Sequence, residues 1–366
     1  MSNLNSRRIK PWFKSYHQVL GIVLVSNLIV YYLTASGRLN VSKEGDNRLS
    51  QSIFINGKSN TTTIPFDVLS MAVLTPEQVL RNPFIIPQGE AEAIPPITMS
   101  EIGHFGGMDF DTNGVSPTTW KWMVERLNIK SILDVGCGRG ISTAWFHFHG
   151  LTTRCVDGST EAREKSVLPD PNSQVVIHDF SRAPWWPGRT YDAVWCVQFL
   201  EHVSRAFHKN ILPTFRKAGL IFVTYSNTGG LHHVEVHRRD WWRSKLEFYG
   251  FRYLEDVTTE IRTMAWKEAN NIKTNMNPKG KQFKAGYIYA NMMVFLNPLV
   301  AALPEHAHLL YEPGCFHSTK NGILIQRECG DGTEEDFETP LPNEFKPLTL
   351  TKAQDEQWIK RVKLMK

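Results

Sequence analysis

Short apolar runs alternate with amphipathic stretches from about residue 116 to residue 250. The apolar runs predict buried strands at 131–135, 153–156, 175–177, 193–197 and 220–224, and later runs at 251–256 and 287–296 are expected to complete the sheet. Helices are expected at about 116–128, 141–149, 159–167, 205–217 and 239–249, the first capped by Ser116 with Pro117 at its first position. This alternation predicts a parallel sheet covered by helices.

The N-terminal region has a different pattern. Four basic residues and no acid occupy the first 14 positions, and no Asp, Glu, Lys or Arg follows from Ser15 to Gly37. About 20 apolar residues suffice to cross a bilayer as a helix. We therefore expect a cytosolic tail at 1–16, a transmembrane anchor at 17–36 and a stem with an N-terminal extension at 37–114. A signal peptide cleaved near 34–36 and a soluble helix are the alternatives.

Two glycosylation triplets, at Asn40 and Asn60, lie just past the expected anchor. They would face the lumen in a single-pass type II protein, which predicts a glycoprotein of the secretory pathway, such as a Golgi enzyme. Of the five cysteines, Cys315 and Cys329 could pair in such a lumen, although the sequence leaves this open, while Cys137 and Cys196 are expected to pack as small apolar groups.

Composition and charge exclude several classes. With 366 residues, 42% of them hydrophobic and 21% charged, the chain has enough apolar material for a sizeable core and is not wholly disordered. The net charge of +5 is spread along the chain, which argues against a nucleic-acid partner. Five cysteines without a CxxC pair exclude a disulfide-framework mini-protein and disfavour a structural zinc module.

A glycine loop after the first predicted strand is the strongest chemical signal. The strand reaches Asp134, and glycine then occupies alternate positions, Gly136, Gly138 and Gly140. Glycine lets a ligand approach the backbone closely, and open parallel sheets bind ligands at the carboxyl ends of their strands. Nicotinamide enzymes have G-x-G-x-x-G here, but the third glycine comes one residue early, and Asp134 suits a cationic ligand better than a pyrophosphate.

Two more acids follow the next two predicted strands. Asp157 ends the second strand, where a carboxylate can accept both hydroxyls of a ribose. Asp179 precedes Phe180, and such a pair can hydrogen-bond an adenine amine and cover its ring. Either acid alone would be an ordinary strand-end cap. Their joint position after successive strands favours an adenosine-containing ligand.

A further segment, 191–203, contains Cys196 and ends in Glu201-His202-Val203. With this segment and the preceding motifs, residues 116–257 resemble the class I S-adenosylmethionine-dependent methyltransferases. The resemblance implies a doubly wound, Rossmann-like α/β fold: a seven-stranded sheet with an antiparallel last strand at 285–297, in a domain at 115–297 followed by a C-terminal extension at 298–366. It implies S-adenosyl-L-methionine as the cofactor, bound by Asp134, Gly136, Cys137, Gly138, Gly140, Asp157, Gly158, Asp179, Phe180 and Cys196.

The methyl acceptor is expected beyond the fourth and fifth strands. His202 follows the fourth strand, and His232 and His233 follow the fifth; these three are the candidate catalytic residues, because histidine can act as a base near neutral pH. In a strand-like segment, His233, Glu235 and His237 would share one face, so a metal set is an alternative, and a structural role is another.

The predicted function is therefore methyl transfer from S-adenosylmethionine to a hydroxyl of a glycan or small molecule. An inactive methyltransferase fold that binds a partner is one alternative, although the intact glycine loop and acids argue against it. A nicotinamide-dependent oxidoreductase is disfavoured by the glycine spacing. The anchor and stem would also suit a membrane-anchored glycosyltransferase, but no DxD motif lies in a suitable loop. The oligomeric state stays open.

Overall fold

The computed structural model describes residues 85–97, 111–270, 283–310, 315–318, 324–327 and 345–364. All of them belong to the second of two structural units, Val73–Lys366. The predicted anchor, both glycosylation triplets and Cys329 lie outside the described residues, so the predicted pairing of Cys329 stays a prediction. Within the described residues, no helix combines the length and apolar character that a membrane crossing requires.

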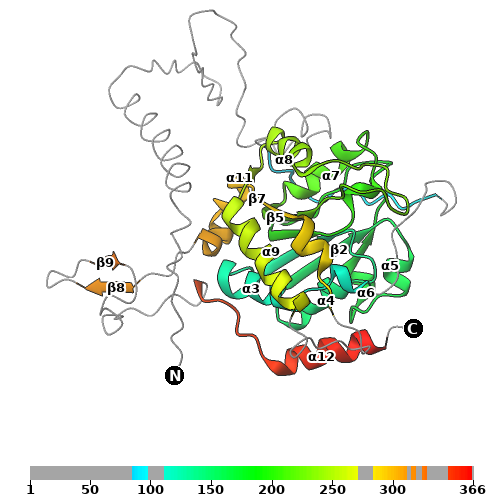
Figure 1. Ribbon diagram of the computed structural model, residues 1–366. Coiled ribbons are helices and arrows are strands. Elements are labelled where there is room, and N and C mark those ends of the chain that lie inside the picture. The colour runs from blue at the N-terminus through cyan, green and yellow to red at the C-terminus, as the bar shows by residue number, and fades with distance from the viewer. Residues whose placement is uncertain are drawn as a thin grey trace, which may run out of the picture. The chain divides into compact units, whose positions relative to one another are not determined.

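A seven-stranded sheet organises the fold, in the order β3-β2-β1-β4-β5-β7-β6 (Figure 1). Strands β1 to β5 pair in parallel, and β7 runs antiparallel to both β5 and β6, which confirms the predicted Rossmann-like sheet with its reversed last strand. The strands are β1 (Ser131–Val135), β2 (Thr152–Asp157), β3 (Val175–Ile177), β4 (Tyr191–Cys196), β5 (Ala218–Thr224), β6 (Arg252–Tyr253) and β7 (Met292–Leu296).

Helices cover both faces of this sheet. The α-helices are α3 (Pro117–Leu127), α4 (Ile141–Phe148), α5 (Glu161–Glu164), α6 (Pro171–Gln174), α7 (His208–Phe215), α8 (Arg239–Phe248), α9 (Glu255–Asn270), α10 (Gly286–Asn291), α11 (Pro298–Ala301) and α12 (Lys352–Lys363). Short 3₁₀ turns lie at η1 (Thr112–Gly114), η2 (Leu200–His202) and η3 (Pro304–Leu310), and a separate hairpin joins β8 (Cys315–Ser318) to β9 (Leu324–Arg327).

Alternation along the strands divides the core between the two faces. Trp195 of β4 contacts the aromatic rings of Trp120 on α3 and Phe146 on α4. Its neighbour Val194 belongs instead to the cluster that contains Trp242 of α8. The strands are buried on both sides, as near-continuous apolar runs predict for a parallel sheet.

The two late runs each supply a strand of the sheet, as predicted, but both strands are shorter than expected. The strand expected at 251–256 contains only β6, and α9 follows it, because Val257, Ile261 and Ala265 recur at helical spacing and are buried. The strand expected at 285–297 starts with α10, which follows Ala285 in a left-handed conformation (φ 48°), and only its second half is β7. The helix expected at 159–167 is limited to the four residues of α5.

Two segments from outside the expected domain pack on it. In the segment 85–97, the backbone N–H of Ile94 donates to His178 Nδ1 (3.0 Å), and the Ile94 carbonyl accepts from the N–H of Asp179 (2.8 Å). Helix α12 packs on α4, where the Trp358 indole donates to the carbonyl of Ile141 (3.0 Å; Figure 1). The segment 85–97 therefore holds the backbone that follows β3, and α12 holds the backbone that follows the glycine loop.

Candidate active site

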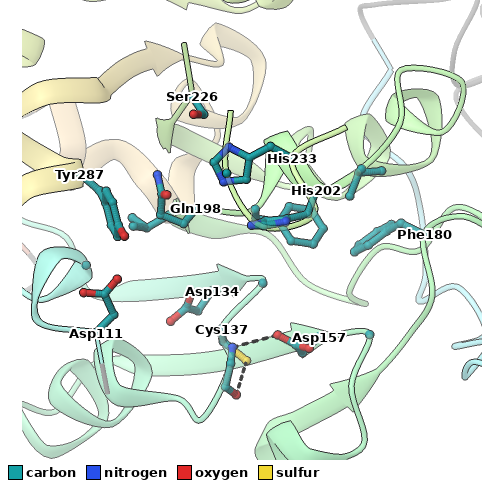
Figure 2. Close-up of a pocket in the computed structure, with 18 of the residues that line it drawn as sticks. Asp111, Asp134, Cys137, Asp157, Phe180, Gln198, His202, Ser226, His233 and Tyr287 are labelled. Carbon is teal, nitrogen blue, oxygen red and sulfur yellow. Dashed lines mark hydrogen bonds between the residues drawn. The ribbon is translucent and has the colours of Figure 1, made fainter. Parts of the chain in front are cut away.

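A cavity of about 950 Å³ lies at the carboxyl ends of the parallel strands (Figure 2). It brings together residues that are more than 100 positions apart in the sequence. Ten residues predicted from the sequence line it: Asp134, Gly136, Cys137, Gly138, Asp157, Gly158, Asp179, Phe180, His202 and His233. Three other predicted residues, Gly140, Cys196 and His232, lie outside its lining.

The glycine loop connects β1 to α4 and forms the floor of the cofactor half of the cavity. Gly136, Gly138 and Gly140 all have positive φ, at 73°, 52° and 73°. A Cβ atom on Gly136 would collide with the ring of Phe199, so only glycine fits this turn. Gly140 is the residue before α4 and packs against Leu168, which explains why it shapes the loop without lining the cavity.

Three buried carboxylates surround this loop. Ser142 Oγ and Thr143 Oγ1 each donate to Asp134 Oδ2 at 2.6 Å; burial nevertheless raises the pKa of Asp134 to about 6. Asp157 accepts from the backbone N–H groups of Gly138 and Ser159, both at 2.8 Å, and burial raises its pKa above the usual value. These bonds fix each carboxylate beside the loop.

Asp179 differs from Asp134 and Asp157 because one of its carboxylate oxygens is buried without a hydrogen-bond partner. Its Oδ1 accepts from the N–H of Ser181 (2.8 Å), whereas its buried Oδ2 has no hydrogen-bond partner. An unpartnered buried oxygen in the lining of a cavity is costly unless a ligand donates to it. An adenine amine is such a donor, so Asp179, the neighbouring Phe180 ring and the glycine loop fit the adenosyl part of S-adenosylmethionine.

A disulfide joins Cys137 of the glycine loop to Cys155 of β2, with 5.9 Å between the Cα atoms. The expectation that Cys137 packs as a small apolar group is therefore wrong, because Cys155 on the adjacent strand β2 faces it, and no local sequence pattern indicates that pairing. Cys196 is a buried free cysteine, as expected, and burial raises the pKa of its thiol. The disulfide links the cofactor loop covalently to the strand that ends in Asp157.

At the acceptor half of the cavity, His202 and His233 of the lining form a compact cluster with Glu201. Figure 2 shows the two imidazoles on the opposite side of the cavity from Asp134 and Asp157. Their ring centroids are 5.0 Å apart, and one ligand atom from each of the three residues lies within 4.8 Å of the other two. Glu201 lies on η2 behind the lining; it is 0% exposed, and burial raises its pKa to about 7.

The segment after β5 is not the strand-like stretch that the sequence suggested, so His233, Glu235 and His237 do not form one set. Residues 225–238 form turns and irregular backbone, with His232 at a φ of 55°. Glu235 instead bonds His237 Nε2 (2.7 Å) and Arg205 Nε (3.1 Å). Burial would raise the pKa of Glu235, but these bonds outweigh it and lower the pKa to about 2. For Glu235 and His237 the structural alternative holds.

Several lining residues were missed by the sequence analysis. Gln198 and Phe199 come two and three residues after the end of β4 and lie inside the segment 191–203, so their position was an available signal. Tyr287 lies on α10, in a region expected to be a strand, and Asp111 precedes the first expected helix. Burial and the hydrogen bond with Asp111 raise the pKa of Tyr287 to about 12.

Comparisons with known proteins agree with this architecture. Residues 133–223 match the family model described as a methyltransferase domain. Among solved structures, a SAM-dependent methyltransferase from Archaeoglobus fulgidus is 18% identical, with 36% of this chain and 66% of that chain covered and a TM-score of 0.29. Magnesium protoporphyrin IX methyltransferase from Synechocystis PCC 6803, with bound SAM, is 16% identical, with 49% and 74% covered and a TM-score of 0.31. None of the curated proteins matches the chain.

Because these identities and TM-scores are low, the classification rests on the family match and on the motifs. The sheet order, the glycine loop and the family match identify residues 133–223 as a class I S-adenosylmethionine-dependent methyltransferase domain. S-Adenosylmethionine is the cofactor of this family, and the chemistry of the cofactor half fits it.

Proposed function

We propose that the protein is an enzyme that transfers a methyl group from S-adenosylmethionine to a hydroxyl of a glycan or a small molecule. One observation carries the proposal: a single cavity is lined both by the cofactor residues and by His202 and His233, which form a cluster with the buried Glu201. A cofactor-binding module without activity would need only the first set. Imidazole and carboxylate groups are the side chains that accept a proton near neutral pH.

The cofactor half would bind and orient the donor. S-Adenosylmethionine, when bound, supplies an electrophilic methyl group on a positively charged sulfur. Asp157 would accept the ribose hydroxyls with lone pairs left over from its two backbone bonds, and Asp179 Oδ2 would accept the adenine amine. Phe180 would cover the adenine ring. Asp134 lies in the same lining and adds negative charge close to where a sulfonium is expected.

The acceptor half would position a hydroxyl and take up its proton. The acceptor oxygen forms a bond to the methyl carbon while the carbon–sulfur bond breaks, the sulfur keeps the electron pair, and the hydroxyl proton leaves through the cluster to water. His202 and His233 both line the cavity, so without a bound metal ion either imidazole would take up this proton. Such a positioned base contributes about 10²–10⁴-fold in rate.

The test has two arms. Isothermal titration with S-adenosylmethionine and its demethylated product should show one binding site per chain. A labelled-methyl screen of glycans, lipids and small hydroxyl compounds should then transfer label to an oxygen that acid or base treatment identifies as an ether. Binding without any transfer in such a screen would favour an inactive partner-binding module, and label on nitrogen or carbon would exclude the hydroxyl as acceptor.

We also propose that the enzyme is a single-pass type II membrane protein of the secretory pathway, with its catalytic domain in the lumen. The uncharged segment from Ser15 to Gly37 and the triplets at Asn40 and Asn60 support this location. The disulfide between Cys137 and Cys155 fits an oxidising compartment. Protease protection of sealed microsomes and a glycosidase-dependent mass shift would test it; digestion of the domain in intact vesicles contradicts it.

A further inference from the structure

We propose that Glu201, His202 and His233 bind a divalent first-row transition metal ion at the acceptor end of the cavity. The three residues come from two separate loops, the turn η2 after β4 and the segment after β5. One ligand atom of each lies within 4.8 Å of the other two, a separation that a single ion at about 2.0–2.2 Å from each ligand can bridge with small side-chain movements.

Each of the two imidazoles places its Nδ1 against a backbone carbonyl. His233 Nδ1 lies 3.0 Å from the carbonyl oxygen of Thr228, and His202 Nδ1 lies 3.2 Å from the carbonyl oxygen of His232. Since a carbonyl only accepts hydrogen bonds, each Nδ1 carries the proton, and the lone pair of the neutral ring is on Nε2. A backbone carbonyl that fixes the tautomer of a histidine is the common outer partner of a metal ligand.

The carboxylate of Glu201 gives an independent indication of a ligand. The side chain is 0% exposed, and neither Oε1 nor Oε2 has a hydrogen-bond partner. Its own backbone carbonyl is satisfied, because it accepts from the N–H groups of Val234 and Glu235. A buried carboxylate is normally paired or bound to a metal. Asp192, at the start of β4, shows the usual arrangement, with His306 Nδ1 at 2.6 Å and two backbone N–H donors.

The ligand types select the ion. Two imidazoles and one carboxylate suit zinc and its first-row neighbours, whereas magnesium and calcium prefer a set of oxygen ligands. Three protein ligands also leave coordination positions for a water or a substrate oxygen. Its catalytic role, which rests on the proposed function, would be to bind the acceptor hydroxyl and lower its pKa so that its proton passes to water.

The binding test needs no acceptor and no cofactor. The full chain, expressed without a histidine tag and stripped with a chelator, is titrated with Co²⁺ while the visible absorption is recorded, and Zn²⁺ is then added in competition. We expect one Co²⁺ per chain with d–d bands typical of nitrogen and oxygen ligands, displaced by one equivalent of Zn²⁺. Absence of stoichiometric Co²⁺ and Zn²⁺ binding, with or without binding of Mg²⁺, overturns the proposal.

Variants assign the ion to the cluster. Glu201→Gln and His233→Ala should each weaken Co²⁺ binding at least tenfold. Two controls should bind Co²⁺ as the unmodified chain does: His147→Ala changes a histidine on α4, and Glu268→Gln changes another buried carboxylate, which bonds Ser116 and Thr118. Unchanged binding by both cluster variants, or equal loss in the controls, overturns the assignment.

Folding and function are separated by two further measurements. Diethyl pyrocarbonate modification of the unmodified chain should be slowed by Zn²⁺ at His202 and His233, which needs no variant to fold; equal rates with and without Zn²⁺ count against the site. Titration with S-adenosylmethionine on the same samples reports on the proposed function. If the chain binds the cofactor and transfers methyl groups but binds no metal ion, only the proposed metal site is refuted. If it binds the metal ion but transfers no methyl group, only the proposed methyltransferase activity is refuted.

Discussion

The two halves of the cavity satisfy their charged groups in different ways. In the cofactor half, Asp157 and Asp179 each bond a backbone N–H two residues further along the chain, Ser159 and Ser181. In the acceptor half, Glu201 has no partner for its carboxylate, and His202 depends on a carbonyl 30 residues away. The first half is therefore built largely by local turns and leaves one carboxylate oxygen, Asp179 Oδ2, without a partner. The second half is assembled from two loops and leaves both carboxylate oxygens of Glu201 without one.

This comparison predicts that changes in the acceptor half reduce turnover and leave cofactor affinity intact. His233→Ala should lower turnover by about 10²–10⁴-fold, because it removes a group that takes part in proton removal or holds the ion that promotes it. Cofactor affinity measured by isothermal titration should change by less than about threefold, equivalent to about 0.7 kcal/mol. His147→Ala on α4 is the control and should behave as the unmodified chain. Parallel loss of cofactor affinity in His233→Ala would show that the two halves are not separable.

The converse test changes the glycine loop. Gly136→Ala should reduce affinity for S-adenosylmethionine at least about 100-fold, since the added Cβ collides with Phe199 and the φ of 73° is unfavourable for alanine. Gly150→Ala is a matched control: its φ is 87°, but nothing lies within 4 Å of the added Cβ. We expect it to cost about 1–2 kcal/mol of unfolding free energy with unchanged affinity. Equal affinities in both variants would mean that the loop does not contact the cofactor.

Removing the disulfide between Cys137 and Cys155 measures how much this covalent link contributes to the stability of the cofactor half. Cys155→Ala opens the bond to Cys137, whose 18-residue separation corresponds to about 3 kcal/mol of unfolding free energy in the loop-entropy model. Denaturant unfolding without reductant should show this loss, and reductant should lower the stability of the unmodified chain by a similar amount. Cys196→Ala, which removes a buried free thiol, is the control and should keep its sensitivity to reductant. A chain whose five thiols all titrate without reductant contradicts the bond.

The smallest expected effect concerns Asp192, a fully paired carboxylate on the strand that leads to Glu201. Burial would raise the pKa of Asp192, but the bonds from His306, His308 and the backbone of Lys130 outweigh it and hold the pKa well below 3.8. Because the folded pKa is depressed, the carboxylate stabilises the fold above its unfolded pKa and loses that contribution as the pH falls towards the folded value.

Asp192→Asn should therefore cost about 2 kcal/mol of unfolding free energy at neutral pH. The difference from the unmodified chain should shrink as the pH is lowered below about 4, the ordinary aspartate range. Denaturant unfolding at a series of pH values measures both quantities. A difference that is constant between neutral and acidic pH would show that Asp192 has the same pKa in the folded and unfolded chain.

The cofactor half could be predicted well from local sequence, because the motifs that form it span only a few neighbouring residues. Strand β1, the glycine loop and α4 follow each other within 18 residues. The continuous burial of β1 follows from its apolar run, and the positive φ values of the loop follow from its glycines. The prediction failed where a short apolar run was ambiguous. Residues 251–256 have too little sequence to separate a strand from the start of α9, and only the spacing of Val257, Ile261 and Ala265 decides it.

The sequence by itself determined the class of the domain, the sheet and the acids near the cofactor loop, since strand ends and glycine turns are encoded by neighbouring residues. Only the tertiary structure decided that Cys137 meets Cys155, that Trp358 of α12 packs behind the loop, and that His233 groups with Glu201 and not with Glu235 of its own segment. These contacts join residues 18 to 217 positions apart. They depend on how loops and helices pack above the sheet, and no local periodicity records that packing.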